Sequence, residues 1–166
     1  MNLKQLALFF LFLCCSTSLF SQQTRWVDDI LPDSLLDDPA FRICYNEDQA
    51  IQYFNNGKGM EYEGDKPALT DIFHKQYKPV ASIGQTGFIR IRFIVNCNGE
   101  SGRFRMLCSD LNYLPVQFDT NITDQLLAIT KSLKGWKPKL WKESKVDYYQ
   151  YLLFKIKDGN LIAILP

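Results

Sequence analysis

The most regular hydrophobic pattern in the chain is the strict alternation of apolar and other residues from Gly87 to Ser109, interrupted by Asn98-Gly99. In each arm the apolar side chains fall mainly on one face and the arginines on the other, as in half-buried strands. Asn-Gly favours a tight turn because it supplies positive φ angles. The pattern therefore predicts a β-hairpin.

A two-residue turn at Asn98-Gly99 would fix the register of this hairpin. It would place Ile89 opposite Cys108, Ile91 opposite Met106 and Phe93 opposite Phe104. The other face then carries a basic cluster, Arg90, Arg92, Arg103 and Arg105. Such a cluster is either a binding surface for an anionic partner or a solvated face, and the sequence leaves both interpretations open.

The end of the chain predicts a second hairpin, with strands over 146–157 and 161–165 joined at Asp158-Gly159. The middle of the longer strand is apolar or aromatic on both faces, which is typical of a central strand. The shorter strand comes last and ends at Pro166, which has no N–H to donate, so it is expected at an edge. We expect a partner strand to bind along this edge, at Leu161, Ile162, Ala163, Ile164 and Leu165.

Apolar residues at helical spacing predict two main helices, 66–77 with Asp65 as N-cap and about 121–134 opened by Asn121. Trp136, after the second helix, is expected to be buried. A shorter helix is predicted from Asn46 to 54, and the loop 110–119 should bury its apolar residues if it packs against the domain. The predicted class is α+β, an antiparallel sheet of about four strands with the two main helices on one face.

Residues 1–21 resemble a cleavable secretory signal, since Lys4 is the only charged residue and a wholly apolar run follows it. A retained membrane anchor is the minority interpretation, because the uncharged run is at the lower limit of a bilayer span. Cys14 or Cys15 raises lipoprotein processing as an alternative. We expect an exported protein of the periplasm or cell envelope, with 22–65 an N-terminal extension and 66–166 the main domain.

Three cysteines remain after residue 21, namely Cys44, Cys97 and Cys108. The hairpin separates Cys97 from Cys108 by about 26 Å of strand, too far for a disulfide. Cys44 is therefore one partner if a bond forms. Cys97 is favoured as the other, because Cys108 lies on the core face, where a free cysteine behaves as a small hydrophobe. The alternative is that all three are reduced.

Charge and motif content argue against several classes of protein. Removing residues 1–21 takes away only Lys4 and leaves 18 basic and 18 acidic side chains, which is unlike a nucleic-acid-binding polycation. His74 is the only histidine, and the chain has no Gly-rich phosphate loop, nucleophile-elbow motif or clustered metal ligands. We therefore expect no enzyme activity, catalytic residue, cofactor or metal.

The order of motifs over residues 66–166 resembles the C-terminal domain of TonB, which couples the inner membrane to outer-membrane transporters. The motifs are Tyr77-Lys78-Pro79 after a helix, an alternating strand ending in Phe93-Ile94-Val95, Trp136-Lys137-Pro138 after a helix, and a strand start at Lys145-Val146. The resemblance implies a module that binds an extended peptide of an envelope partner, such as an outer-membrane transporter, by strand addition.

The chain also departs from the TonB pattern. It has no long Pro-rich spacer, no glycine in the loop after Trp136-Lys137-Pro138, and an extra portion over 22–65. Two other functions stay open: a structural envelope protein whose sheet edges are blocked by 22–65, and a small enzyme.

Overall fold

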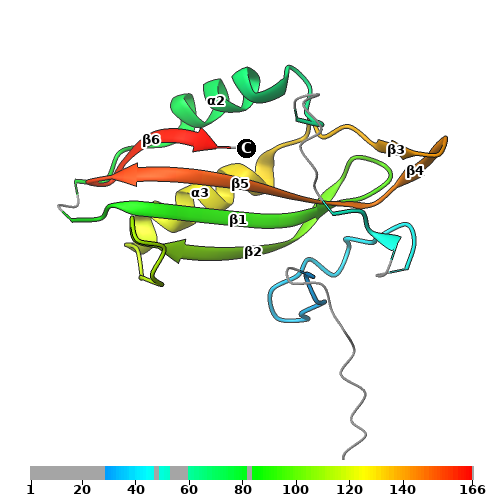
Figure 1. Cartoon of the computed structure of the whole chain (residues 1–166), viewed down its shortest axis with the longest axis horizontal. Helices are drawn as coiled ribbons and strands as arrows, with labels where there is room; N and C mark the ends of the chain where they lie inside the picture. The colour runs from blue at the N-terminus through cyan, green and yellow to red at the C-terminus, as the bar shows by residue number, and fades with distance from the viewer. Residues whose placement is uncertain (1–28, 47–48, 53–59, 82–83, 166) are drawn as a thin grey trace, which may run out of the picture.

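The computed structural model describes residues 29–46, 49–52, 60–81 and 84–165. The expected signal sequence and the lipidation of Cys14 or Cys15 lie outside these residues. Within them the chain is α+β, as predicted, with a four-stranded antiparallel sheet and two helices (Figure 1).

The strands follow one another in the sheet in the order β2-β1-β5-β6. Their bounds are Gly87–Val95 for β1, Ser101–Ser109 for β2, Tyr148–Lys157 for β5 and Asn160–Leu165 for β6. The two predicted hairpins are therefore joined side by side through β1 and β5. As predicted, β5 is central and the last strand, β6, is outermost.

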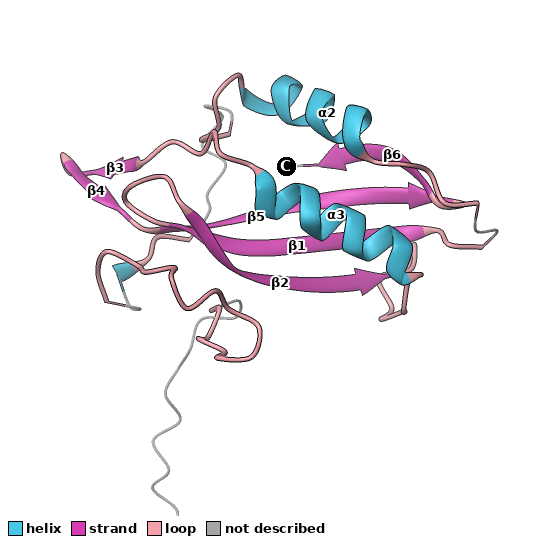
Figure 2. Ribbon diagram, turned by 180° about the vertical axis from the view of Figure 1, so that it is seen from behind, coloured by secondary structure: helices cyan, strands magenta, loops and turns pink. Residues whose placement is uncertain are grey.

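Helix α2 (Asp65–Gln76) and helix α3 (Thr120–Ser132) lie on the same face of the sheet (Figure 2). The apolar stripe of α3 buries Ile122, Leu126 and Ile129, while α2 buries Leu69 and Phe73. These side chains meet the inward residues of β1 and β5 in one main core. Both helices thus exist because their stripes match the apolar face of the sheet.

Both predicted helix starts need correction. The N-cap of α3 is Asp119, whose carboxylate accepts a hydrogen bond from the Asn121 amide, so Asn121 is inside the helix. In α2 the N-cap is Gly64, at φ 76°, and Asp65 is the first helical residue. The Asp65 carboxylate instead accepts amide hydrogen bonds from Met60 and Lys66 and fixes the approach to the helix.

The register of the first hairpin is right at its open end and wrong near its turn. Ile89 pairs with Cys108 and Ile91 with Met106, as predicted, but beyond Arg92 the pairing shifts by one residue. The loop contains Cys97 as well as Asn98-Gly99, because the Asn96 amide donates to Glu100 O and the Gly99 amide to Asn96 O. A bulge with Arg103 at φ 55° absorbs the extra residue.

Phe93 and Phe104 still meet across this bulge, with their ring centroids 5.2 Å apart. Trp136 is buried, as predicted, and its ring lies against Tyr62 and Phe93 at 4.8 and 5.1 Å between centroids. Tyr62 belongs to the chain before α2, so this part of the N-terminal extension contributes to the main core.

Two other local predictions are wrong. The Gln49 amide donates to Asn46 O, but Ile51 bridges Tyr148 instead of continuing a helix, so the helix expected from Asn46 does not reach Ile51. The last residues of that expected helix lie outside the described ranges. The loop after β2 exposes most of its apolar residues instead of burying them. Those exposed are Leu111, Tyr113 and Leu114, whereas Phe118 packs against the core.

A small hairpin of β3 (Lys139–Trp141) and β4 (Ser144–Val146) projects beyond the sheet (Figure 1). It was not predicted, because its turn residues Lys142 and Glu143 have positive φ angles that usually require Gly or Asn. None of the helices in the described ranges is long and apolar enough to span a membrane.

Candidate functional site: the outer face and free edge of the sheet

The side of the sheet opposite the helices, here called the outer face, has two unequal halves. Side chains on it come from alternate residues of each strand, so neighbouring strands form rows across the sheet. One half is covered by residues 29–46 and 49–52, here called the N-terminal cover. The covered half contains Ile94, Tyr149 and Arg105.

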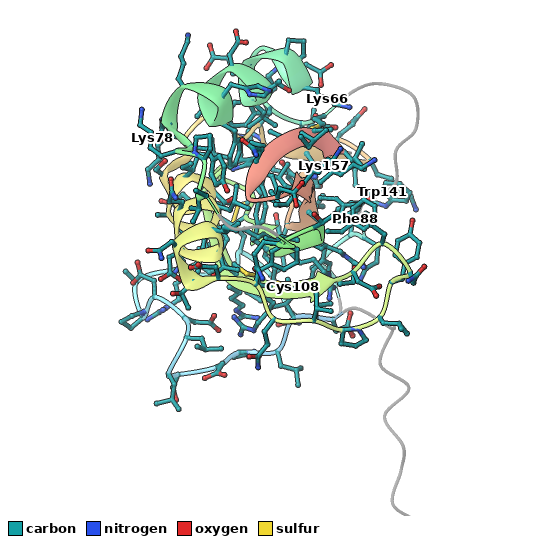
Figure 3. All side chains as sticks on the ribbon, turned by 90° about the vertical axis from the view of Figure 1, so that its left-hand side faces the viewer. Lys66, Lys78, Phe88, Cys108, Trp141 and Lys157 are labelled. Atoms are coloured by element: carbon teal, nitrogen blue, oxygen red, sulfur yellow. A yellow bond between two sulfur atoms is a disulfide. The ribbon has the colours of Figure 1, made fainter. Side chains whose placement is uncertain are left out.

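The open half lies toward the start of β1 and the end of β2. It has two rows, which are Leu107, Arg90, Leu153 and Leu165, then Ser109, Phe88, Lys155 and Ala163. Figure 3 shows Phe88 on the side of the sheet away from the helices.

The four strands of the sheet contain no aspartate or glutamate. They contain six basic residues, Arg90, Arg92, Arg103, Arg105, Lys155 and Lys157. The predicted basic cluster therefore belongs to a sheet without any carboxylate of its own. Acidic groups reach this sheet only from other segments, and the N-terminal cover supplies one of them.

Apolar packing holds the N-terminal cover on the covered half. Ile30 is buried with Ile94 and Tyr149, and the partly buried Phe41 and Ile43 pack against the same group. Phe41 lies directly over Gly102 of β2, where a Cβ would come within 2.2 Å of the Phe41 ring. Glycine at this position is what allows the ring to approach the strand.

An ion pair adds to this packing. Arg105 contacts both carboxylate oxygens of Asp37, at 2.6 and 2.9 Å, and also donates to the carbonyl of Leu31. The Arg105 hydrogen bond holds the pKa of Asp37 below its ordinary value, and the same bond raises the pKa of Arg105. One of the four predicted basic residues is thus used inside the molecule, to bind the chain's own acidic segment.

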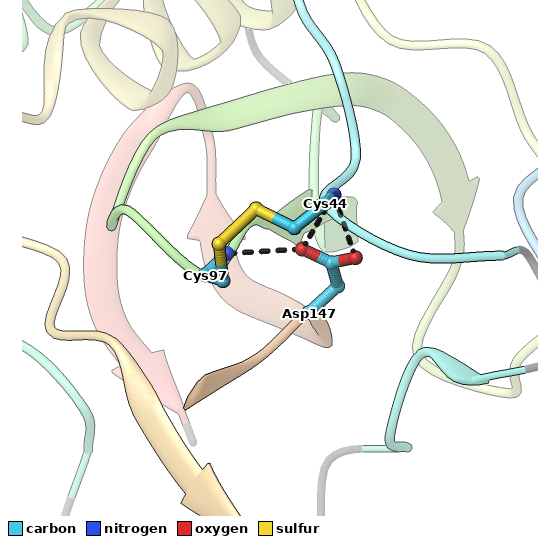
Figure 4. A group of neighbouring side chains, drawn as sticks. All are labelled: Cys44, Cys97 and Asp147. Carbon is cyan, nitrogen blue, oxygen red and sulfur yellow. Dashed lines mark hydrogen bonds between the residues drawn. A yellow bond between two sulfur atoms is a disulfide. The ribbon is translucent and has the colours of Figure 1, made fainter. Parts of the chain in front are cut away.

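The far end of the N-terminal cover is fixed covalently. Cys44 is joined to Cys97 in the hairpin turn, with 6.0 Å between their Cα atoms, as the sequence favoured (Figure 4). Cys108 is free, as predicted, but only half-buried. Burial raises the pKa of its thiol, which makes the reactive thiolate scarce at neutral pH.

Asp147 adds a second fastening at the same place. Its carboxylate is fully buried and accepts hydrogen bonds from the amides of Cys44, Tyr45 and Cys97, at 2.9–3.1 Å. Figure 4 shows the bonds from Cys44 and Cys97. The residue stands at the junction between β4 and β5. One buried carboxylate therefore joins the N-terminal cover, the hairpin turn and the central strand.

Cys44, Cys97 and Asp147 also form a group with potential metal ligands within 4.8 Å of one another. Here the two sulfur atoms are bonded to each other, and the carboxylate oxygens accept backbone amides. In this state the donor atoms already have partners, so the group is a structural fastening.

The N-terminal cover also pairs with one edge of β5. The Ile51 amide donates to Asp147 O, and the Tyr149 amide donates to Ile51 O. Ile51 thus occupies the side of β5 away from β1, next to Tyr148. β6 occupies that same side of β5 from Leu153 to Lys157.

The backbone of β6 has a defined orientation. Because the Tyr149 amide points away from β1 and β5 has no bulge against β1, Leu153 and Lys155 also direct their backbone groups toward β6. Their partners Leu165 and Ala163 face β5 in return. Ile164, between them, therefore directs its N–H and C=O away from the sheet.

Access to this edge is uneven. Ile164 is only 4% exposed, and its side chain belongs to the main core, whereas Ile162 is 50% exposed and lies at a bulge opposite Lys155 and Ile156. α2 runs beside β6 (Figure 1). Solvent reaches the predicted edge strand chiefly around Ile162.

The structure thus brings the predicted edge residues 161–165 together on one strand and the four arginines together on the outer face. Sequence reasoning missed Asp147 and the N-terminal cover. The only signal for Asp147 was an acidic residue directly before a largely apolar strand. Nothing in the pattern of 29–52 showed that it would lie on the arginine face.

No family model, curated protein or solved structure matched this chain.

Proposed function

We propose that this chain is an exported interaction module of the cell envelope, which binds an extended segment of a partner protein by adding it as a strand to β6. The observation that carries the proposal is the position of β6. It is the outermost strand of the sheet, and within the described residues no other segment pairs with Leu161–Leu165 except β5.

The composition of β6 supports strand addition. Residues Leu161–Leu165 are apolar without exception, and they include none of the lysines or other charges that commonly protect an edge. The outward N–H and C=O of Ile164 are the backbone groups that an added strand requires. Because Ile162 is the exposed position, the partner would first contact the strand there and extend toward Ile164.

The Cys44–Cys97 disulfide agrees with an exported protein, because disulfides persist in oxidising compartments. The resemblance to the TonB C-terminal domain suggests the class of partner, a protein of the envelope such as an outer-membrane transporter. The arginines of the outer face would then act mainly on the rate of encounter and its salt dependence.

The proposal can be tested with peptides selected from a random library for binding to the mature chain, that is, the chain without residues 1–21. Strand addition predicts that a bound peptide protects the Ile164 amide from hydrogen exchange. Ile164→Pro removes that N–H and should abolish binding, whereas Ile164→Val keeps it and should not. Arg92→Ala should weaken binding only modestly and mostly at low salt.

Unchanged near-UV circular dichroism and thermal midpoint would show that the variants are folded. If Ile164→Pro stays folded and still binds, or if Arg92→Ala has the larger effect, the strand-addition proposal is wrong.

A purely structural envelope role is the second candidate, and one observation favours it. Ile51 does occupy part of the β5 edge, at Tyr148 and Tyr149, so the extension over 22–65 blocks some of the sheet. Its described residues do not pair with β6. Library selections that yield no peptide protecting the Ile164 amide would favour this role.

A further inference from the structure

The N-terminal cover shows which chemistry the outer face binds. It is an irregular segment with turns at 33–37 and 38–41, in which Ile30 and Phe41 pack on apolar side chains while Asp37 pairs with Arg105. Four of its thirteen residues from Asp29 to Phe41 are aspartates, against no basic residue. One half of the outer face therefore already binds an acidic apolar segment.

The open half presents the same chemistry on the same strands. Its apolar groups include Leu107, which is 58% exposed, and Phe88, whose ring stacks on that of Tyr113 at 5.5 Å between centroids. Tyr113 itself is 74% exposed. Basic groups stand among them, with the Arg90 guanidinium 5.3 Å from the Tyr151 ring centroid and Lys155 exposed in the next row.

Aromatic residues and arginine are the groups most enriched where proteins bind one another. Apolar residues also continue beyond the strands, because Leu111, Leu114 and Val116 of the loop after β2 are exposed. The segment 114–116 lies along the end of β2, where the Val116 amide donates to Cys108 O. The apolar surface is therefore continuous from the open half onto a loop that the sheet holds in place.

We infer that the open half of the outer face is a docking surface for an irregular, acidic and apolar segment of a partner protein, chemically like the chain's own residues 29–41. Two arguments commit the surface to this occupant. The open half is continuous with a half that already binds such a segment, and it presents the exposed Lys155 on strands that contain no aspartate or glutamate of their own. The surface reaches β6 through the side chains of Leu165 and Ala163, but it uses side chains on the face of the sheet and not the outward backbone groups of β6, so the inference does not depend on strand addition.

A synthetic peptide with the sequence of residues 29–41 is the probe, added to the intact mature protein with methyl-labelled Leu and Ile. Binding at the open half should shift the methyl signals of Leu107 and Leu153 in a saturable way, at peptide concentrations up to about 1 mM, where weak binding is still measurable. The signal of Ile94, under the N-terminal cover, should not move.

The control peptide carries asparagine in place of all four aspartates and should bind several-fold more weakly. Leu107→Ser should weaken binding by about 5-fold and Lys155→Glu by about 3-fold, as a lost apolar contact and a reversed surface charge do. Leu140→Ser is the matched control, because Leu140 is similarly exposed but lies on the β3–β4 hairpin. It should leave binding unchanged.

Saturable shifts at Leu107 and Leu153 that Leu107→Ser weakens would support the docking surface. Shifts confined to Ile162 and Ile164 would overturn it and point instead to the β6 edge. Shifts at Ile94 would also overturn it, because the peptide would then be replacing the N-terminal cover. The absence of any saturable shift, or equal binding by the asparagine peptide, would equally contradict the inference.

Discussion

The two halves of the outer face are made by the same strands, yet one is buried and the other is open. In the covered half Ile94 and Tyr149 lie beneath Ile30, while in the open half Leu107 and Lys155 face solvent. The strands do not explain the difference, since both halves mix apolar and basic residues. The N-terminal cover explains it, because the disulfide and Asp147 fix where this segment lies.

Removing the disulfide should have the largest effect on this difference. Cys44 and Cys97 are 53 residues apart, and in the chain-entropy model a loop of that size stabilises the fold by about 4 kcal/mol. The Cys44→Ser/Cys97→Ser variant should lose roughly that much in denaturant unfolding. Cys108→Ser, at a free cysteine, is the control and should lose less than about 1 kcal/mol. Equal losses in the two proteins would show that the disulfide does not hold the cover.

Much of the sheet could be predicted because its signals are local. Alternation over 87–95 determines which residues of β1 point inward, and the largely apolar run in β5 marks it as a central strand, whatever the rest of the chain does. The turn was harder, because Asn98-Gly99 suits both a two-residue loop and the longer loop that forms. The bulge at Arg103 restores the predicted pairing, so the error stays confined to the end of the hairpin.

The covered half could not be predicted because its contacts join residues far apart in sequence. The Asp147 carboxylate binds amides about a hundred and about fifty residues earlier in the chain, and backbone amides leave no trace in a sequence pattern. Neither Asp37 nor Arg105 is distinguishable from other surface residues in the sequence, and only the fold brings them together. The arginine cluster was found, but its internal partner was not.

Removing the Asp147 carboxylate should cause the second-largest loss of unfolding free energy. Asp147→Ala leaves three part-buried amides without their acceptor, and each unsatisfied group costs up to about 1–3 kcal/mol, partly relieved by relaxation and solvent. We expect a loss of about 3 kcal/mol in urea unfolding. Asp147→Asn keeps one acceptor oxygen and should lose less. If alanine were no worse than asparagine, the carboxylate would not be the second fastening.

The next smaller effect is expected from Gly102→Ala, which should disturb the contact between the N-terminal cover and β2. Gly102→Ala places a Cβ against the Phe41 ring and should cost about 1–2 kcal/mol, as overpacking does. In a Phe41→Ala background the same change should cost almost nothing, because the clash is gone. Additive losses in this double-mutant cycle would contradict the contact.

The Asp37–Arg105 pair should have the smallest effect, about 1 kcal/mol. Since the folded pKa of Asp37 lies below its ordinary value of 3.8, the pair stabilises the fold above that value. The stabilisation is lost as pH falls through the folded pKa. The difference in unfolding free energy between wild type and Asp37→Asn should therefore be full near neutral pH and shrink in acid below 3.8. A difference that grows in acid would have the wrong sign.

Hydroxyl-radical footprinting read by mass spectrometry tests most directly whether the fastened cover separates the two halves. In the native protein Leu107 and Tyr113 should react quickly, while Ile94 and Tyr149 are protected. In Cys44→Ser/Cys97→Ser, Ile94 and Tyr149 should gain reactivity, with Ile91 on the helix face still protected as proof of folding. Equal reactivity of Tyr113 and Tyr149 in the native protein, or unchanged protection of Ile94 in that variant, would contradict the account.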